Sequence, residues 1–195
     1  SNPTSSPIIT LNINTPPTAF SVSPSNTTGC ACTAVKLNVA SDGTPVMYQW
    51  RRNGLNFGAP IAGNLNIASA TVGTHDGTWD VIASVPTCAA TITSSPATLT
   101  INTAPTTFSA LPTSTTVCAG NAATLQVASD GNSVSYQWRR NGLSFGGAIA
   151  SNLSIARATI GTHDGTWDVV ASVQGCASTL TSGRCGPLNI YRPPP

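Results

Sequence analysis

The chain has 195 residues, of which 40% are hydrophobic and only 7% are charged, and its formal net charge at pH 7 is +2. A typical soluble domain is about 25% charged, so Ser, Thr and Asn side chains must solubilise this surface. The weak, scattered positive charge argues against a nucleic-acid partner. The chain also lacks an apolar run of about 18 residues, so we expect no membrane span.

Alternation of apolar and polar residues recurs along the first half of the chain, which is the pattern of half-buried β-strands. The alternating segments are, in chain order, 9–13, 35–39, 46–50, 79–85 and 97–101. Asn-Gly and Asp-Gly pairs lie between several of them, and these pairs readily adopt the positive φ angles of tight turns. No window has a convincing helical stripe, so the sequence predicts an all-β fold.

An internal repeat organises the whole chain. YQWRRNGL at 48–55 recurs at 136–143, and GTHDGTWD at 73–80 recurs at 161–168, both with an offset of 88 residues (136 − 48 and 161 − 73). We therefore predict two copies of one domain, at 18–103 and 104–195, after an N-terminal strand and linker at 1–17. Each copy is long enough to bury one small core.

The motif Tyr-Gln-Trp-Arg-Arg-Asn-Gly, followed by Asp-Gly-Thr-Trp-Asp-Val, resembles the immunoglobulin-like repeats of bacterial cell-surface proteins. It is most similar to the repeats of secreted Bacteroidetes proteins. The resemblance implies two tandem immunoglobulin-like β-sandwiches with an extra N-terminal strand, and a secreted, extracellular or cell-surface location. It also implies that Trp50 and Trp138 are core residues of strand C, and that Trp79 and Trp167 take the strand F position usually held by a tyrosine.

The sequence offers little material for catalysis or metal binding. His75-Asp76 and His163-Asp164 are the only adjacent titratable pairs of this kind, and the chain has no Glu. A metal or catalytic site needs a third or fourth group. We interpret each His as a corner cap and each Asp as a turn residue, and we expect no enzyme activity, no metal and no cofactor.

Two surface features follow from the same pattern. Arg51 and Asp80 point outward on neighbouring strands of the implied fold, so we expect a cross-strand ion pair worth about 0.2–1 kcal/mol. Asn26 and Asn152 each begin an N-glycosylation triplet. Glycan attachment there depends on an organism with the machinery, and chance matches are common in a chain rich in Ser, Thr and Asn.

The cysteines indicate disulfides, because thiols at matched positions of a secreted chain usually pair. Leu37 and Val81 hold the core positions where such domains often carry a Cys–Cys pin. In the implied sandwich Cys30 precedes strand B and Cys88 follows strand F, and these two strands run in the same direction. Roughly 25 Å of strand would then separate the two sulfurs at about 3.3 Å per residue, whereas a disulfide needs Cα atoms within about 7 Å.

This polarity favours a disulfide between Cys30 and Cys176, across the two copies. The same geometry between chains would join Cys118 of one chain to Cys88 of the next. Pairing inside each copy (Cys30 with Cys88, Cys118 with Cys176) and free thiols remain alternatives. Cys32 and Cys185 have no repeat counterparts, and they would pair with each other or reinforce a contact between domains.

The N-terminal segment resembles the last strand of a copy. Residues 10–18 match 98–106, and Ile9, Leu11 and Ile13 alternate in phase with 97–101. An isolated strand leaves its backbone donors and acceptors unpaired. We therefore expect it to join the second domain of a neighbouring chain by strand addition. A dangling tail cut from a longer repeat array is the alternative.

Together these features predict a non-enzymatic structural subunit of an extracellular fibre, whose partners are copies of itself. The alternative is an adhesive or carbohydrate-binding module from a larger secreted repeat protein, with a sugar or a host surface as its partner. A sugar-binding face usually presents planar aromatic groups. The four Trp are expected in the cores and leave Tyr191 as the aromatic residue near an end, so the structural function is favoured.

Overall fold

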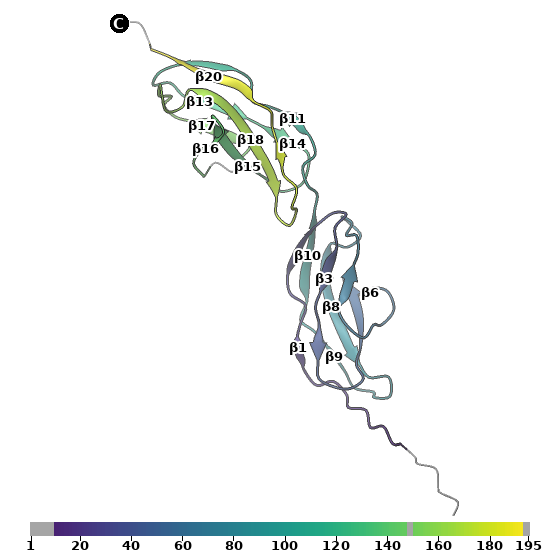
Figure 1. Ribbon diagram of the computed structural model, residues 1–195. Helices are drawn as coiled ribbons and strands as arrows, with labels where there is room; N and C mark the ends of the chain where they lie inside the picture. The colour runs from purple at the N-terminus through teal and green to yellow at the C-terminus, as the bar shows by residue number, and fades with distance from the viewer. Residues whose placement is uncertain (1–9, 148–149, 193–195) are drawn as a thin grey trace, which may run out of the picture. The chain divides into compact units, whose positions relative to one another are not determined.

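The computed structural model describes residues 10–147 and 150–192, which form β-strands joined by turns and loops (Figure 1). The chain divides into two compact units. Unit 1 contains Ser1–Thr27, Lys36–Ile67 and Gly77–Leu99, and unit 2 contains Thr28–Val35, Ala68–Asp76 and Thr100–Pro195. Unit 2 therefore combines the second sequence copy with short segments of the first.

The first copy forms two sheet layers. Its strands are β1 (Phe20–Val22), β2 (Thr27–Cys30), β3 (Val35–Leu37), β4 (Ala40–Ser41), β5 (Met47–Arg52), β6 (Leu55–Asn56), β7 (Leu65–Ile67), β8 (Gly77–Ser84), β9 (Thr91–Thr93) and β10 (Ala97–Asn102). One layer has the order β2-β10-β8-β5-β6, with β9 also paired to β8. The pairs β1-β4 and β3-β7 form the other layer. This is the two-sheet sandwich expected from the sequence.

The second copy repeats this topology. Its strands are β11 (Phe108–Ala110), β12 (Thr115–Cys118), β13 (Ala123–Gln126), β14 (Ala128–Ser129), β15 (Val134–Arg140), β16 (Leu143–Ser144), β17 (Asn152–Ile155), β18 (Gly165–Val173), β19 (Leu180–Thr181) and β20 (Cys185–Tyr191). The larger sheet has the order β12-β20-β18-β15-β16, and β12 runs parallel to β20. The pairs β11-β14 and β13-β17 complete the sandwich.

Four tryptophans form the centres of the cores. Trp50 is 1% exposed, and Trp79, Trp138 and Trp167 are 0% exposed. Along β8 and β18 buried residues alternate with half-buried ones, because successive side chains of a strand point to opposite faces. The strand alternation seen in the sequence thus corresponds to the observed inward and outward faces.

The last strand of the second copy differs from that of the first by one residue. In the first copy, residues 97–99 of β10 pair with Trp79 to Gly77 of β8. In the second copy, the matching three residues of β18 are paired by residues 185–188 of β20, which is one residue more. The pairing of β20 with β18 has a register shift at that point. The sequence indicated a weak strand here. The structure contains a seven-residue strand that absorbs an extra residue at Gly186, between the paired residues Cys185 and Pro187.

Candidate assembly site

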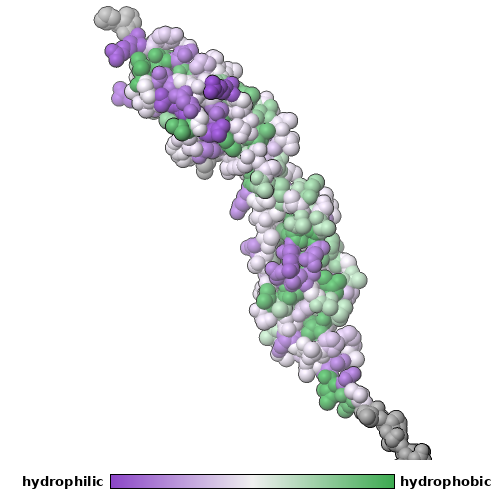
Figure 2. All heavy atoms as spheres, in the orientation of Figure 1, coloured by the Kyte–Doolittle hydropathy of each residue, from purple (hydrophilic) through white to green (hydrophobic). Residues whose placement is uncertain are grey.

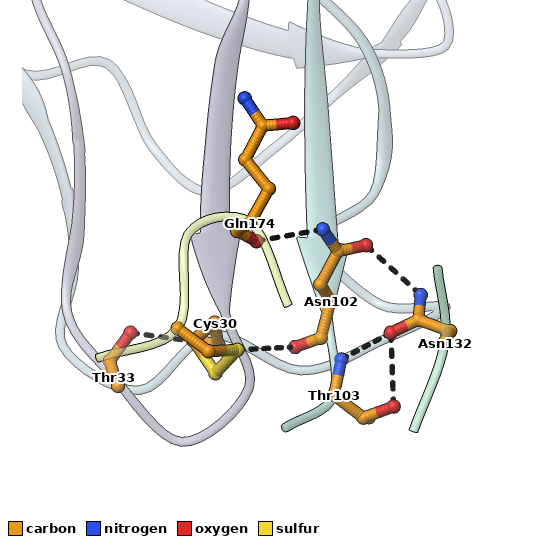
Figure 3. The surroundings of a disulfide bond; sticks show 7 residues. Cys30, Thr33, Asn102, Thr103, Asn132 and Gln174 are labelled. Atoms are coloured by element: carbon orange, nitrogen blue, oxygen red, sulfur yellow. Dashed lines mark hydrogen bonds between the residues drawn. A yellow bond between two sulfur atoms is a disulfide. The ribbon is translucent and has the colours of Figure 1, made fainter. Parts of the chain in front are cut away.

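The structure contains one disulfide among its described residues, between Cys30 at the end of β2 and Cys176 in the turn after β18 (Figure 3). The two Cα atoms are 4.8 Å apart, and 146 residues of sequence separate them. Cys30 comes from the first sequence copy and Cys176 from the second, and both lie in unit 2. The pairing expected from strand direction is therefore present, and the alternative of Cys30 with Cys88 is not formed.

Asn102, at the end of β10, lies beside this disulfide (Figure 3). Its carbonyl oxygen accepts the Ala31 N–H at 2.7 Å and lies 3.8 Å from Cys176 Sγ. Its side-chain Nδ2 donates to the Gln174 carbonyl at 2.9 Å, and its Oδ1 accepts from Asn132 Nδ2 at 3.0 Å. Asn102 is 5% exposed. It thus binds the strand end to the turns that flank the disulfide.

The surroundings of Cys88 repeat those of Cys176. Cys88 Sγ lies 3.9 Å from the carbonyl oxygen of Asn14, which precedes Asn102 by the repeat offset of 88 residues. The Asn14 side chain donates to Thr87 Oγ1 at 2.6 Å. Thr15 next forms an isolated bridge with Thr44. The segment that begins at Asn14 therefore enters the first copy as the segment after Asn102 enters the second.

An aspartate fixes each of these entering segments. Asp42 accepts the backbone N–H groups of Thr18 and Ala19, and these bonds together with the Thr18 hydroxyl lower the pKa of its carboxyl group. Asp130 holds the second entering segment in the same way. The hydroxyl and N–H groups of Thr106 and the N–H of Thr107 lower the pKa of Asp130 to about 2, because they stabilise the carboxylate form.

The surroundings of Cys118 repeat those of Cys30. Cys118 ends β12 as Cys30 ends β2. The next residue, Ala119, donates its N–H to the Tyr191 carbonyl at 2.8 Å, which matches the 2.7 Å bond from Ala31 to Asn102. Cys118 is an exposed free thiol and Cys88 is a half-buried one. Cys118 therefore has the surroundings of Cys30, and Cys88 has those of Cys176, the two partners of the observed disulfide.

The expected assembly strand is exposed where the structure describes it. Leu11 and Ile13 are each 80% exposed, and no strand is assigned to residues 10–14. Ile9 lies outside the described residues. Figure 2 shows hydrophobic surface where the described chain begins. The residues of β10 that match Leu11 and Ile13 are Leu99 and Ile101, and each of these is 1% exposed.

The remaining two cysteines are free thiols. Cys32 is exposed, and Cys185 is 6% exposed on β20, with its Sγ 3.5 Å from Ser182 Oγ. Cys32 and Cys185 do not form a disulfide with each other in this structure.

The His-Asp pairs cap turns as the sequence indicated. Nδ1 of His75 accepts the Thr71 N–H at 2.9 Å, and Nδ1 of His163 accepts the Thr159 N–H at 3.1 Å. The part of the chain that the structure describes holds no group of three or more His, Cys, Asp or Glu placed to bind a metal ion. It also holds no helix that is long and apolar enough to cross a membrane.

Outward-facing charges form the expected ion pair. Arg51 and Asp80 are cross-strand partners on β5 and β8, joined by two bonds of 2.7 Å, and Arg139 and Asp168 repeat the pair in the second copy. Of the two glycosylation candidates, both Asn26 and Asn152 are exposed, and Asn26 Oδ1 accepts the Thr98 N–H at 2.8 Å.

Sequence reasoning identified the cysteines but not Asn14 and Asn102. Both asparagines lie in the matched segments 10–18 and 98–106, so the repeat contained the signal. An asparagine at a strand end has many possible roles, and only the structure shows its contact with the cysteine turn.

Several solved structures are similar to this chain, and they include tandem immunoglobulin domains. Sidekick-1 immunoglobulin domains 1–5 align with a TM-score of 0.63 and 16% identity, over 92% of this chain and 40% of that chain. An I-band fragment of titin aligns with a TM-score of 0.62 and 16% identity, over 92% of this chain and 67% of that one. Extracellular domains 3–5 of Drosophila OTK align with a TM-score of 0.57 and 15% identity, over 89% of this chain and 61% of that one.

These likenesses show that the chain has the fold of tandem immunoglobulin-like domains. No protein-family model matches the chain, and no curated protein matches its sequence.

Proposed function

We propose that the chain is a structural subunit of an extracellular or cell-surface fibre, in which copies join head to tail. Two contacts make the joint: a disulfide from Cys118 of one subunit to Cys88 of the next, and addition of the N-terminal strand of the next subunit to the second copy of the first. A contact between two different surfaces extends without closing, which is the symmetry that a filament requires.

The observation that carries the proposal is the duplicated surroundings of the disulfide. Cys118 has the backbone contacts of Cys30, and Cys88 has those of Cys176, yet both are free thiols on the single chain. If one subunit meets the next as Cys30 meets Cys176, Cys118 and Cys88 reach each other.

The N-terminal segment supports the same arrangement. Leu11 and Ile13 are exposed on the single chain, whereas the matching residues of β10 are buried in a sheet. At the joint between two subunits, the N-terminal segment of the next subunit would lead into its Asn14, beside its Cys88. Within one chain, β10 leads into Asn102, beside Cys176, in the same way. One geometry therefore satisfies both the strand and the thiols.

The location follows from the disulfide chemistry. A disulfide persists in oxidising surroundings outside the cytosol, and the Cys30–Cys176 bond together with the resemblance to secreted Bacteroidetes repeats supports a secreted fibre. Ser, Thr and Asn in place of charges are compatible with close association, since the net charge is only +2 and repulsion between copies is weak.

The test is oxidation of the purified chain, followed by electrophoresis without reductant and by peptide mapping. We expect a ladder of covalent multimers that collapses on reduction, with a peptide pair linking Cys118 to Cys88. Cys88→Ser or Cys118→Ser should remove the ladder. Cys32→Ser is the matched control, because Cys32 is also an exposed thiol but lies outside the proposed joint, and it should leave the ladder intact.

A ladder that survives in Cys88→Ser, or a monomer that stays monomeric under oxidising conditions, would contradict the proposal. Deletion of residues 1–13 tests the strand separately. It keeps Asn14 and both cysteines, and it should prevent long fibres in electron micrographs. Fibres of normal length from this truncated chain would exclude strand addition.

A further inference from the structure

We infer that β20 is a placeholder strand, which completes the second copy's sheet in the free subunit and is displaced by the N-terminal strand of the next subunit. The inference rests on the proposed fibre and names where the incoming strand binds. In the joint, Leu11 takes the place of Leu188, Ile13 that of Ile190, and Asn14 that of Tyr191.

The incoming strand has no vacant position in the sheet. β20 lies between β12 and β18, as β10 lies between β2 and β8. A strand that repeats the role of β10 must therefore enter between β12 and β18, and β20 must leave.

β20 is a less regular copy of β10. It carries an extra residue, Gly186, which the pairing with β18 skips, and the next residue, Pro187, is paired with Thr166 but has no N–H to donate to the ladder. Gly186 lies so close to Ser114 that a Cβ at this position would clash with both the side chain and the backbone of Ser114. While the strand keeps its extra residue, a larger residue there would have to displace Ser114. Glycine itself weakens a strand because it loses more conformational freedom on folding.

The first copy shows what β20 lacks. Asn26 precedes Ser114 by the repeat offset of 88 residues, and its side chain accepts the N–H of Thr98 on β10 at 2.8 Å. In the second copy, Ser114 stands at the position of Asn26. Its side chain is shorter than that of asparagine, and Gly186 packs directly against its backbone.

The N-terminal segment is the closer copy of β10. Residues 9–14 read Ile-Thr-Leu-Asn-Ile-Asn and residues 97–102 read Ala-Thr-Leu-Thr-Ile-Asn, with no insertion between them. Exchange would bury Leu11 and Ile13, which are each 80% exposed on the single chain. Burial of apolar surface then favours the exchanged state.

The residue at the strand end distinguishes the two competitors. Asn102 is bound through its side chain to Gln174 and Asn132, next to the disulfide. Asn14 supplies the same side chain at the proposed joint and already contacts Thr87. Tyr191, which ends β20, is 60% exposed, and its side chain has no amide group to make these hydrogen bonds. The incoming strand therefore restores the asparagine that β20 is missing.

Cys185 provides a direct readout of the exchange. It is a free thiol, 6% exposed, on the residue of β20 that pairs with Trp167. A buried thiol reacts only through local opening of the structure, whereas displacement of β20 brings it into solvent.

The experiment uses the full-length chain with Leu11→Asp and Ile13→Asp, which blocks its own donor strand and leaves β20 intact. A synthetic peptide of residues 7–17 is added, and alkylation of each cysteine by a maleimide is followed by mass spectrometry. We expect the alkylation rate of Cys185 to rise by roughly tenfold or more, because the thiol is released from a closed state. The control peptide carries the same two aspartates and should change nothing, and Cys32, already exposed, should react equally in every sample.

The same labelling of wild-type fibres separates this inference from the proposed function. Fibres with a Cys118–Cys88 bond in which Cys185 stays as protected as in the monomer would overturn the displacement of β20 and leave the fibre standing. Equal Cys185 rates with the two peptides would overturn it as well. Failure of the chain to form multimers under oxidation would instead overturn the proposed function.

Discussion

Asp42 and Asp130 act at the scale of single residues, where each fixes the segment that enters a copy. Each carboxylate accepts two backbone N–H groups and a threonine hydroxyl. Gly43 and Gly131 follow with φ angles of 90° each, and both glycines pack against the backbone of the same entering segment. The Asp-Gly pair thus serves both as a turn and as an anchor for the linker.

The pKa of Asp130, lowered from 3.8 to about 2, predicts acid sensitivity. The ionised carboxylate stabilises the folded chain at pH values above about 4, and this contribution is lost as the pH falls towards 2. Asp130→Asn should flatten this part of the stability profile, measured by urea unfolding between pH 5 and pH 2. Thr106→Val, which removes the hydroxyl donor, should flatten it partly. A profile for Asp130→Asn that superimposes on the wild type would contradict the anchoring role.

At the scale of elements, β18 is supported by its aromatic core. Trp167 is 0% exposed, its ring lies edge-on to Phe145 with centroids 4.9 Å apart, and its Nε1 donates to the His163 carbonyl at 3.1 Å. Trp167→Ala removes these contacts and leaves a cavity. We expect a loss of about 3–5 kcal/mol in the free energy of unfolding, measured with denaturant.

Leu143→Ala is the matched control for this prediction, because Leu143 is apolar but 76% exposed. It should change stability by no more than about 0.5 kcal/mol. Comparable losses in the two variants would show that Trp167 does not carry the core.

The long strands were predictable from the sequence and the short ones were not. Alternation at 79–85 and 97–101 corresponds to β8 and β10, because several consecutive residues there face one core. β6 and β16 have two residues each, so no period can be read from them. β20 was underestimated because Gly186 and Pro187 disfavour a strand by propensity, whereas the shift in register lets the strand continue past them.

Because β20 carries an inserted residue, we predict that removing the insertion makes the second copy more stable. Deleting Pro187, with Gly186→Thr and Ser114→Asn, would restore the pattern of β10 and the side-chain bond seen between Asn26 and Thr98. We expect the free energy of unfolding to rise by about 0.5–1.5 kcal/mol for one regained hydrogen bond. If β20 is a placeholder, the same variant should also form fibres more slowly. Faster assembly of a more stable variant would contradict that role.

At the scale of the whole molecule, the Cys30–Cys176 bond closes most of the chain into a covalent loop. The loop runs from Cys30 to Cys176, which are 146 positions apart in the sequence, and it contains parts of both units. In the chain-entropy model a loop of this length restricts the unfolded chain strongly. Cys176→Ser should therefore lower the free energy of unfolding by about 2–5 kcal/mol, the usual range for loss of a native disulfide. Cys32→Ser should leave it unchanged.

The same loop predicts how the chain behaves when it is cut. Gly58 lies in an exposed turn, and a Cβ built at this residue meets nothing within 4 Å, so a protease recognition sequence inserted after it should be tolerated. Cleavage would separate Cys30 and Cys32 from the other four cysteines. In denaturing gels without reductant the two fragments should stay together, and reductant should release them. Cys30→Ser should release them without reductant and Cys32→Ser should not, which identifies the cysteine that makes the bond. Fragments that separate from the unreduced wild-type chain would show that the Cys30–Cys176 bond is not formed.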